Sequence, residues 1–197
     1  MTIKKLGILG LPVVLVLAAV VPLSAAAGGA QHVRWDVISL VGGAPPGPVN
    51  AGGMASAKAP DGDTITLTGT GTFVAPAGSN GGSGAVTGGG TWQTNTGSGT
   101  YQVKELVTFV MANFQSSTPA FIDNIGNLSA RANGTAVLRI QFSDGQSGVL
   151  TVGCHGPGAP PGIFEGIATT KGYKTYYAVQ DPVGGVDANR TIFHVNK

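Results

Sequence analysis

The alternation of apolar and polar residues is most regular between residues 135 and 155. Every second residue is apolar in both halves of this segment, with Leu138, Ile140 and Phe142 in the first and Leu150, Val152 and Cys154 in the second. A period of two is typical of β-strands with one buried face, and Asp144-Gly145 is a turn signal. A three-residue loop, Ser143–Gly145, opposes Leu138 to Leu150 and keeps one apolar face, whereas a two-residue loop turns the second strand over. We therefore predict a hairpin with the three-residue loop.

Similar patterns and turn residues predict further strands at residues 32–40, 54–59, 64–75, 85–96, 100–112, 163–170, 173–179 and 191–195. Proline-rich residues 42–53 and 156–162 predict exposed loops, because proline lacks a donor for a strand ladder. Residues 114–132 predict a long connection with a helical turn near 120–125. Gly69 and Gly71 fall on the expected inner face of their strand, which predicts a bend or a close approach of another backbone.

These strands predict an all-β domain, and 33 glycines in 197 residues fit a chain with many turns. We predict an antiparallel barrel of about eight strands, because closure leaves no exposed sheet edge. A β-sandwich or jelly roll is the alternative.

The N-terminus has the layout of a secretory signal peptide. Lys4 and Lys5 precede an apolar run from Leu6 to Leu23, and small residues follow at 24–27. We expect cleavage after Ala27, which divides the chain into a signal helix at 1–27 and one β-barrel domain at 28–197. The prediction is a secreted or periplasmic protein without a membrane segment after cleavage; a retained membrane anchor is the alternative.

Charge and cysteine content exclude several classes of protein. The formal net charge is +2, and both excess positive charges belong to the signal segment. A neutral domain has no electrostatic footprint for nucleic acid. Cys154 is the single cysteine, so no intrachain disulfide forms.

The sequence contains no strong catalytic or metal-binding motif. Cys154 and His155 are the most reactive neighbouring pair, but adjacent strand residues point to opposite faces. The three histidines are far apart in sequence, and no HxH, HExxH or CxxC spacing occurs. We predict no metal and no cofactor.

The candidate catalytic residues are Glu105, Glu165 and Cys154. If Glu105 and Glu165 face the lumen of the barrel together with Tyr101 and Cys154, they form an acid/base pocket. In the alternative, Lys104, Leu106 and Val110 face inward and Glu105 is solvated, as carboxylates usually are.

Several runs also carry a resemblance to known proteins, namely GTGTF (residues 69–73), GGGTW (88–92), GTYQV (99–103), VGCH (152–155) and VDANRTIFHV (186–195). They resemble a group of uncharacterised secreted bacterial β-proteins, a likeness that implies no activity. The order of glycine-rich strands is similar to the barrels of allene oxide cyclase and dirigent proteins, which implies a barrel fold and transfers no functional residue.

Three functions fit these expectations. A barrel with an open lumen binds a small apolar ligand through the aromatic residues Tyr101, Trp92 and Phe109, with Trp35 and Tyr173 as further candidates. The same barrel with an inward carboxylate is a cofactor-free isomerase or cyclase. A filled lumen favours a structural module or a surface that interacts with a partner. The thin acid/base inventory favours binding over catalysis, and the sequence does not determine the oligomeric state.

Overall fold

The computed structural model describes residues 29–42, 47–77, 82–118, 121–179 and 189–196. The expected signal segment at 1–27 lies outside the described residues, and so does most of the loop before the last strand. The signal helix therefore stays a prediction.

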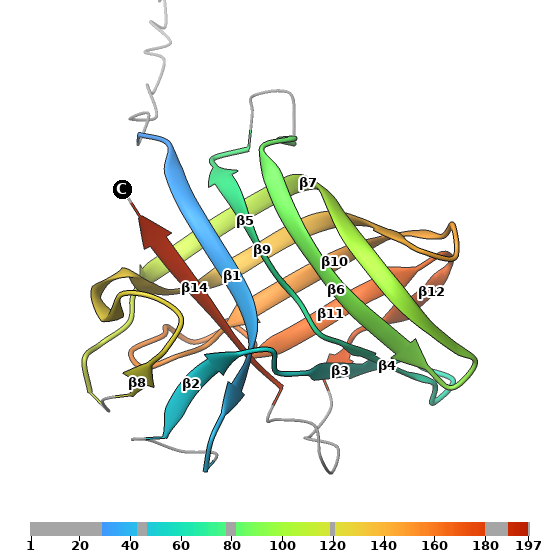
Figure 1. The fold of residues 1–197 in the computed structure, drawn as a ribbon, viewed down its shortest axis with the longest axis horizontal. Helices are drawn as coiled ribbons and strands as arrows, with labels where there is room; N and C mark the ends of the chain where they lie inside the picture. The colour runs from blue at the N-terminus through green and yellow to red at the C-terminus, as the bar shows by residue number, and fades with distance from the viewer. Residues whose placement is uncertain (1–28, 43–46, 78–81, 119–120, 180–188, 197) are drawn as a thin grey trace, which may run out of the picture.

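The centre of the fold is a closed antiparallel barrel, and the sandwich alternative does not apply (Figure 1). Its strands, in the order in which they pair around the ring, are β9 (Arg131–Phe142), β14 (Arg190–Asn196), β1 (Gln31–Leu40), β5 (Thr70–Ala75), β6 (Val86–Thr94) and β7 (Gly97–Phe114). β7 pairs with β9 and closes the ring. The closed barrel has six strands, so the prediction of about eight is not confirmed.

Additional strands extend this sheet outside the ring. One extension continues from β9 through β10 (Ser147–Cys154), β11 (Gly166–Lys171) and β12 (Lys174–Tyr176). A second continues from β6 through β4 (Thr64–Leu67), β3 (Ala55–Lys58) and β13 (Ala178–Val179). Finally, β2 (Pro48–Ala51) pairs with β1 and, in parallel, with β8 (Ile122–Asp123). These last two strands form an outer layer beside the ring.

Two local predictions in this outer layer are wrong. Residues 48–51, expected in a loop, form β2, because only Pro48 lacks a donor and it occupies the first position of the strand. Residues 122–123, expected in a helical turn, form β8. A short 3₁₀ helix follows at Leu128–Ala130, where the side chain of Asn127 accepts a hydrogen bond from the Ser129 amide. Within the described residues no helix is long and apolar enough to span a bilayer.

The predicted hairpin is confirmed in both register and loop length. Leu138 lies opposite Leu150, and the Phe142 amide donates to the carbonyl of Gln146 across a three-residue loop. Gly145 in that loop has φ of 89°, a conformation that glycine adopts without strain. Leu138 and Leu150 are both fully buried, so the hairpin contributes one apolar face to the core.

The inward face of β7 changes along the strand because its pairing with β9 contains bulges. Tyr101 and Val103 are buried, and a register shift before Glu105 then turns Leu106 into the core. The alternative reading is therefore right for Leu106, which is buried, and for Glu105, which faces away from the core. It is wrong for Lys104 and Val110, which are exposed.

Side chains fill the lumen of the barrel. At one end the rings of Phe73, Phe109 and Phe193 pack edge to face, with centroids 5.1–6.5 Å apart. At the other end Trp92 packs 5.9 Å from Phe142, and the ammonium of Lys171 lies 4.2 Å from the centre of the Trp92 ring. These contacts join a single buried cluster that also includes Trp35.

Gly69 and Gly71 make room for this filling, as their predicted close approach requires. A Cβ atom on Gly71 would lie 2.3 Å from the Thr87 carbonyl oxygen and 2.8 Å from Nε1 of Trp35. A Cβ atom on Gly69 would lie 2.2 Å from the Tyr101 hydroxyl, which donates a hydrogen bond to the Thr68 carbonyl. The rings of Trp35 and Tyr101 therefore occupy the space that side chains at these two positions would need.

We expect Gly71→Ala to lower the free energy of unfolding by about 1–3 kcal/mol, because the added methyl group overlaps fixed backbone and the Trp35 ring. Urea unfolding followed by tryptophan fluorescence measures this change. Gly84→Ala is the control, since a Cβ there meets no atom within 4 Å. Equal stability of the two variants would contradict the packing described.

Candidate functional site

The outer face of β1 and β14 carries a second, smaller core. Alternate residues of β1 point into the barrel, as Trp35 and Val37 do, and the intervening Ile38 and Leu40 point outward. Outward side chains are normally solvated, but here Ile38 is 4% and Leu40 3% exposed. The outer layer covers them with Val49 of β2 and with Phe121.

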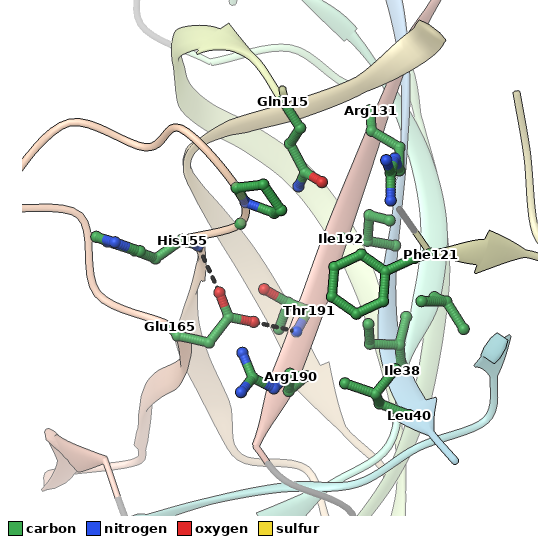
Figure 2. Close-up of a pocket in the computed structure, with 13 residues that line it drawn as sticks. Ile38, Leu40, Gln115, Phe121, Arg131, His155, Glu165, Arg190, Thr191 and Ile192 are labelled. Carbon is green, nitrogen blue, oxygen red and sulfur yellow. Dashed lines mark hydrogen bonds between the residues drawn. The ribbon is translucent and has the colours of Figure 1, made fainter. Parts of the chain in front are cut away.

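A cavity of about 280 Å³ adjoins this second core, and we call it the outer cavity. Its apolar wall consists of Ile38, Leu40, Val49, Phe121 and Ile192. Its polar groups belong to Gln115, Arg131, His155, Glu165, Arg190 and Thr191. In Figure 2, Gln115 and Arg131 project from above, and Glu165 and Arg190 lie below them. An apolar wall with a few convergent polar groups is the usual composition of a ligand site.

Glu165 connects two segments at the edge of the outer cavity (Figure 2). One carboxylate oxygen accepts a hydrogen bond from the backbone amide of His155, and the other accepts one from the amide of Thr191 at 2.6 Å. Burial raises the pKa of Glu165 to about 7, although these two bonds and the charge of Arg190 act in the opposite direction. Glu165 therefore holds the end of β10 against β14.

Two arginines bring positive charge to the same space. Arg131 is only 3% exposed, and its guanidinium lies 5.8 Å from the centre of the Phe121 ring. Nε of Arg131 and Nε of Arg190 are buried, and neither has a hydrogen-bond partner within the described part of the chain. Both arginines line the outer cavity.

A buried contact between His194 and Asp123 attaches the outer layer to the barrel. Nε2 of His194 lies 2.9 Å from a carboxylate oxygen of Asp123, and both side chains are almost completely buried. The other oxygen of Asp123 accepts hydrogen bonds from the amides of Ile125 and Gly126. Burial alone would raise the pKa of Asp123, but the bonds from His194 and these amides outweigh it and lower that pKa.

The predicted acid/base pocket does not assemble. Of its members only Glu165 lines the outer cavity. Glu105 lies on the outer side of β7 and forms an ion pair of 2.9 Å with Arg139. The thiol of Cys154 is buried beside Gln115, whose Nε2 donates to its sulfur at 3.3 Å. Burial and then the charge of Glu165 raise the pKa of Cys154 far above its usual value, which makes the thiol a poor nucleophile.

The three predicted ligand contacts lie in the packed lumen. Tyr101 and Trp92 are 2% and 5% exposed, and Phe109 packs against the same cluster. None of them lines the outer cavity or the two other cavities near residues 114–131 and 195–196. Their role in binding stays a prediction. Tyr173, a further candidate, is fully exposed in the turn between β11 and β12.

Sequence reasoning did not identify Arg131 and Arg190. Arg131 begins a strand between two alanines, Ala130 and Ala132, and both alanines are buried. A charged residue within a buried run is the one sequence signal that could have identified it. No group of three or more His, Cys, Asp or Glu residues that could hold a metal occurs among the described residues.

Comparisons of the chain with protein-family models, with curated proteins and with solved structures found no match.

The pKa of Glu165 predicts how stability changes with pH. A carboxyl whose pKa rises from 4.5 to about 7 on folding binds more protons in the folded state, so stability falls as pH increases from 4.5 to 7. The loss amounts to at most about 3 kcal/mol. Glu165→Gln should remove this slope in urea unfolding measured at pH 5, 6, 7 and 8. An unchanged slope in the variant would contradict the assignment.

We expect Asp123→Asn to lower the free energy of unfolding by about 3 kcal/mol at pH 7, because the buried carboxylate that bonds to His194 becomes a neutral amide, which cannot accept at both of its positions. The lowered pKa of Asp123 means that the wild-type contribution is present above pH 3.8 and is lost as pH falls below it. Asp61→Asn is the control, since Asp61 pairs with Lys174 at the surface and should matter far less. Equal effects of both substitutions in urea unfolding would disprove the anchoring role.

Proposed function

We propose that this protein binds a small, largely apolar molecule in the outer cavity and acts outside the cytoplasm. The observation that carries the proposal is the composition of that cavity, in which an apolar wall of five side chains faces polar groups that include two buried arginine Nε donors without a partner among the described residues. Export follows from the predicted signal peptide. The expected likeness to secreted bacterial β-proteins agrees with this location.

The binding proposal differs from the sequence-based expectation in where the ligand lies. A filled lumen favours a structural module, because the side chains of the barrel leave no room inside it. The outer cavity is the reason to prefer binding, since it offers space of about 280 Å³ beside a rigid wall. The layer that covers this cavity is held by the Asp123–His194 pair and therefore fixes its shape.

Catalysis by the cavity is the less favoured function. Among the described residues, Glu165 is the carboxylate that lines the outer cavity, and a pKa near 7 would suit a general base. Both of its oxygens, however, already accept hydrogen bonds from backbone amides. This arrangement supports a structural task for Glu165 and a binding task for the cavity.

Binding of 1-aminoanthracene, a neutral fluorescent aromatic probe, tests the proposal. We expect saturable binding of about one probe per chain, and Val49→Phe should abolish it because the larger ring fills the cavity. Val41→Phe is the matched control, since Val41 is 54% exposed and does not line the cavity. Circular dichroism checks that both variants fold. Binding that survives Val49→Phe unchanged, or no binding to the wild type, would refute the proposal.

A further inference from the structure

Arg131 is a buried positive charge, and the part of the chain that the structure describes gives it no counter-charge. No carboxylate lies within 4.0 Å of its guanidinium among the described residues, and its Nε has no acceptor. An arginine cannot escape this situation by losing its proton, because it stays charged in proteins. Buried charges are normally paired, since removing an ion from water costs several kcal/mol.

The neighbours of Arg131 are already neutralised. On the same outer face, the fully buried carboxylate of Asp36 forms two hydrogen bonds with Arg34, at 2.8 and 2.9 Å. His194, which lies opposite Arg131 in the sheet, is paired with Asp123. Among the described residues of this face, Arg131 is therefore a buried guanidinium whose charge is not balanced.

The contacts of Arg131 compensate it only in part. Phe121 offers the face of its ring at 5.8 Å, a weaker attraction than an ion pair. Glu165 lines the same cavity, but its two carboxylate oxygens already accept hydrogen bonds from the amides of His155 and Thr191. The free Nε of Arg190 adds a second donor. As far as the described residues line it, the outer cavity therefore offers fewer hydrogen-bond acceptors and less negative charge than its arginines require.

From this imbalance we infer that the ligand of the outer cavity is an amphipathic anion, whose oxyanion head pairs with Arg131 while its apolar body lies on Ile38, Val49 and Ile192. A guanidinium presents a planar fork of donors that matches a carboxylate, and it also binds sulfate and phosphate groups. The inference rests on the proposed binding function and specifies the class of ligand.

Displacement of bound 1-aminoanthracene at pH 7 tests the inference with three molecules that share an eight-carbon chain. Octanoate and octyl sulfate carry an anionic head, and 1-octanol is neutral. We expect at least one anion to displace the probe at about tenfold lower concentration than 1-octanol, because a charge-assisted hydrogen bond replaces an unmade one. The better of the two anions identifies the preferred head group.

Arg131→Met should weaken the preferred anion about tenfold or more and leave 1-octanol within about twofold. Arg139→Met is the matched control on the same strand, because Arg139 is exposed and pairs with Glu105 outside the cavity. Arg131→Met should also unfold at an equal or higher urea concentration than the wild type, since it removes an unpaired buried charge. A marked loss of stability would mean that the fold itself satisfies Arg131, and would overturn the inference.

The outcomes separate the two proposals. If the probe does not bind, or binds regardless of Val49→Phe, the proposed function fails. If it binds in the cavity and 1-octanol displaces it as well as both anions do, the binding function stands and the anionic ligand is refuted.

Discussion

The packing of aromatic side chains inside the barrel is the constraint on which the rest of the structure depends. Interiors are as dense as organic crystals, so a ring that occupies the lumen excludes any ligand of similar size. Trp35 and Phe193 are completely buried there, and Gly69 and Gly71 lack the side chains that would overlap the rings of Trp35 and Tyr101. A barrel filled in this way leaves no room for a ligand inside it, so a binding site would have to lie on its outside.

The outer layer covers part of the outer surface of the barrel, so that side chains there are buried as well. A strand of a closed barrel usually has one dry and one wet face, whereas β1 buries Val37 and Ile38 on opposite faces. Covering the second face requires that its charged groups be paired, and the Asp123–His194 and Arg34–Asp36 contacts meet that requirement. The outer cavity lies where this cover ends, so its walls are preorganised by the same contacts that hold the layer. Preorganised walls reduce the entropy that binding costs.

Much of the fold was predictable because it follows from local patterns. The hairpin of β9 and β10 could be placed to the residue, since a one-residue slip would have exposed Leu150. The direction of the Glu105 side chain could not be predicted. Bulges in β7 reverse its inward face twice within a few residues, and the alternation of apolar and polar residues does not show where they occur. The sequence pattern does not predict β8 either, because two residues are too few to show a period. The parts of the fold that the sequence does not predict are therefore the places where strand pairing is irregular.

The candidate site could not be predicted from the sequence for a different reason, which is the topology of the fold. Its walls come from Ile38 on the first strand, Arg131 at the start of β9, Glu165 before β11 and Ile192 on the last strand. Closure of the ring pairs the first strand with the last, and no residue spacing in the sequence predicts that pairing. Arg131 was visible only as a charge among buried alanines, which is unfavourable in isolation. If the cavity binds the anion that we propose, the same feature is a cost that the folded chain carries until the anion enters, and the arginine should then matter more for binding than for folding.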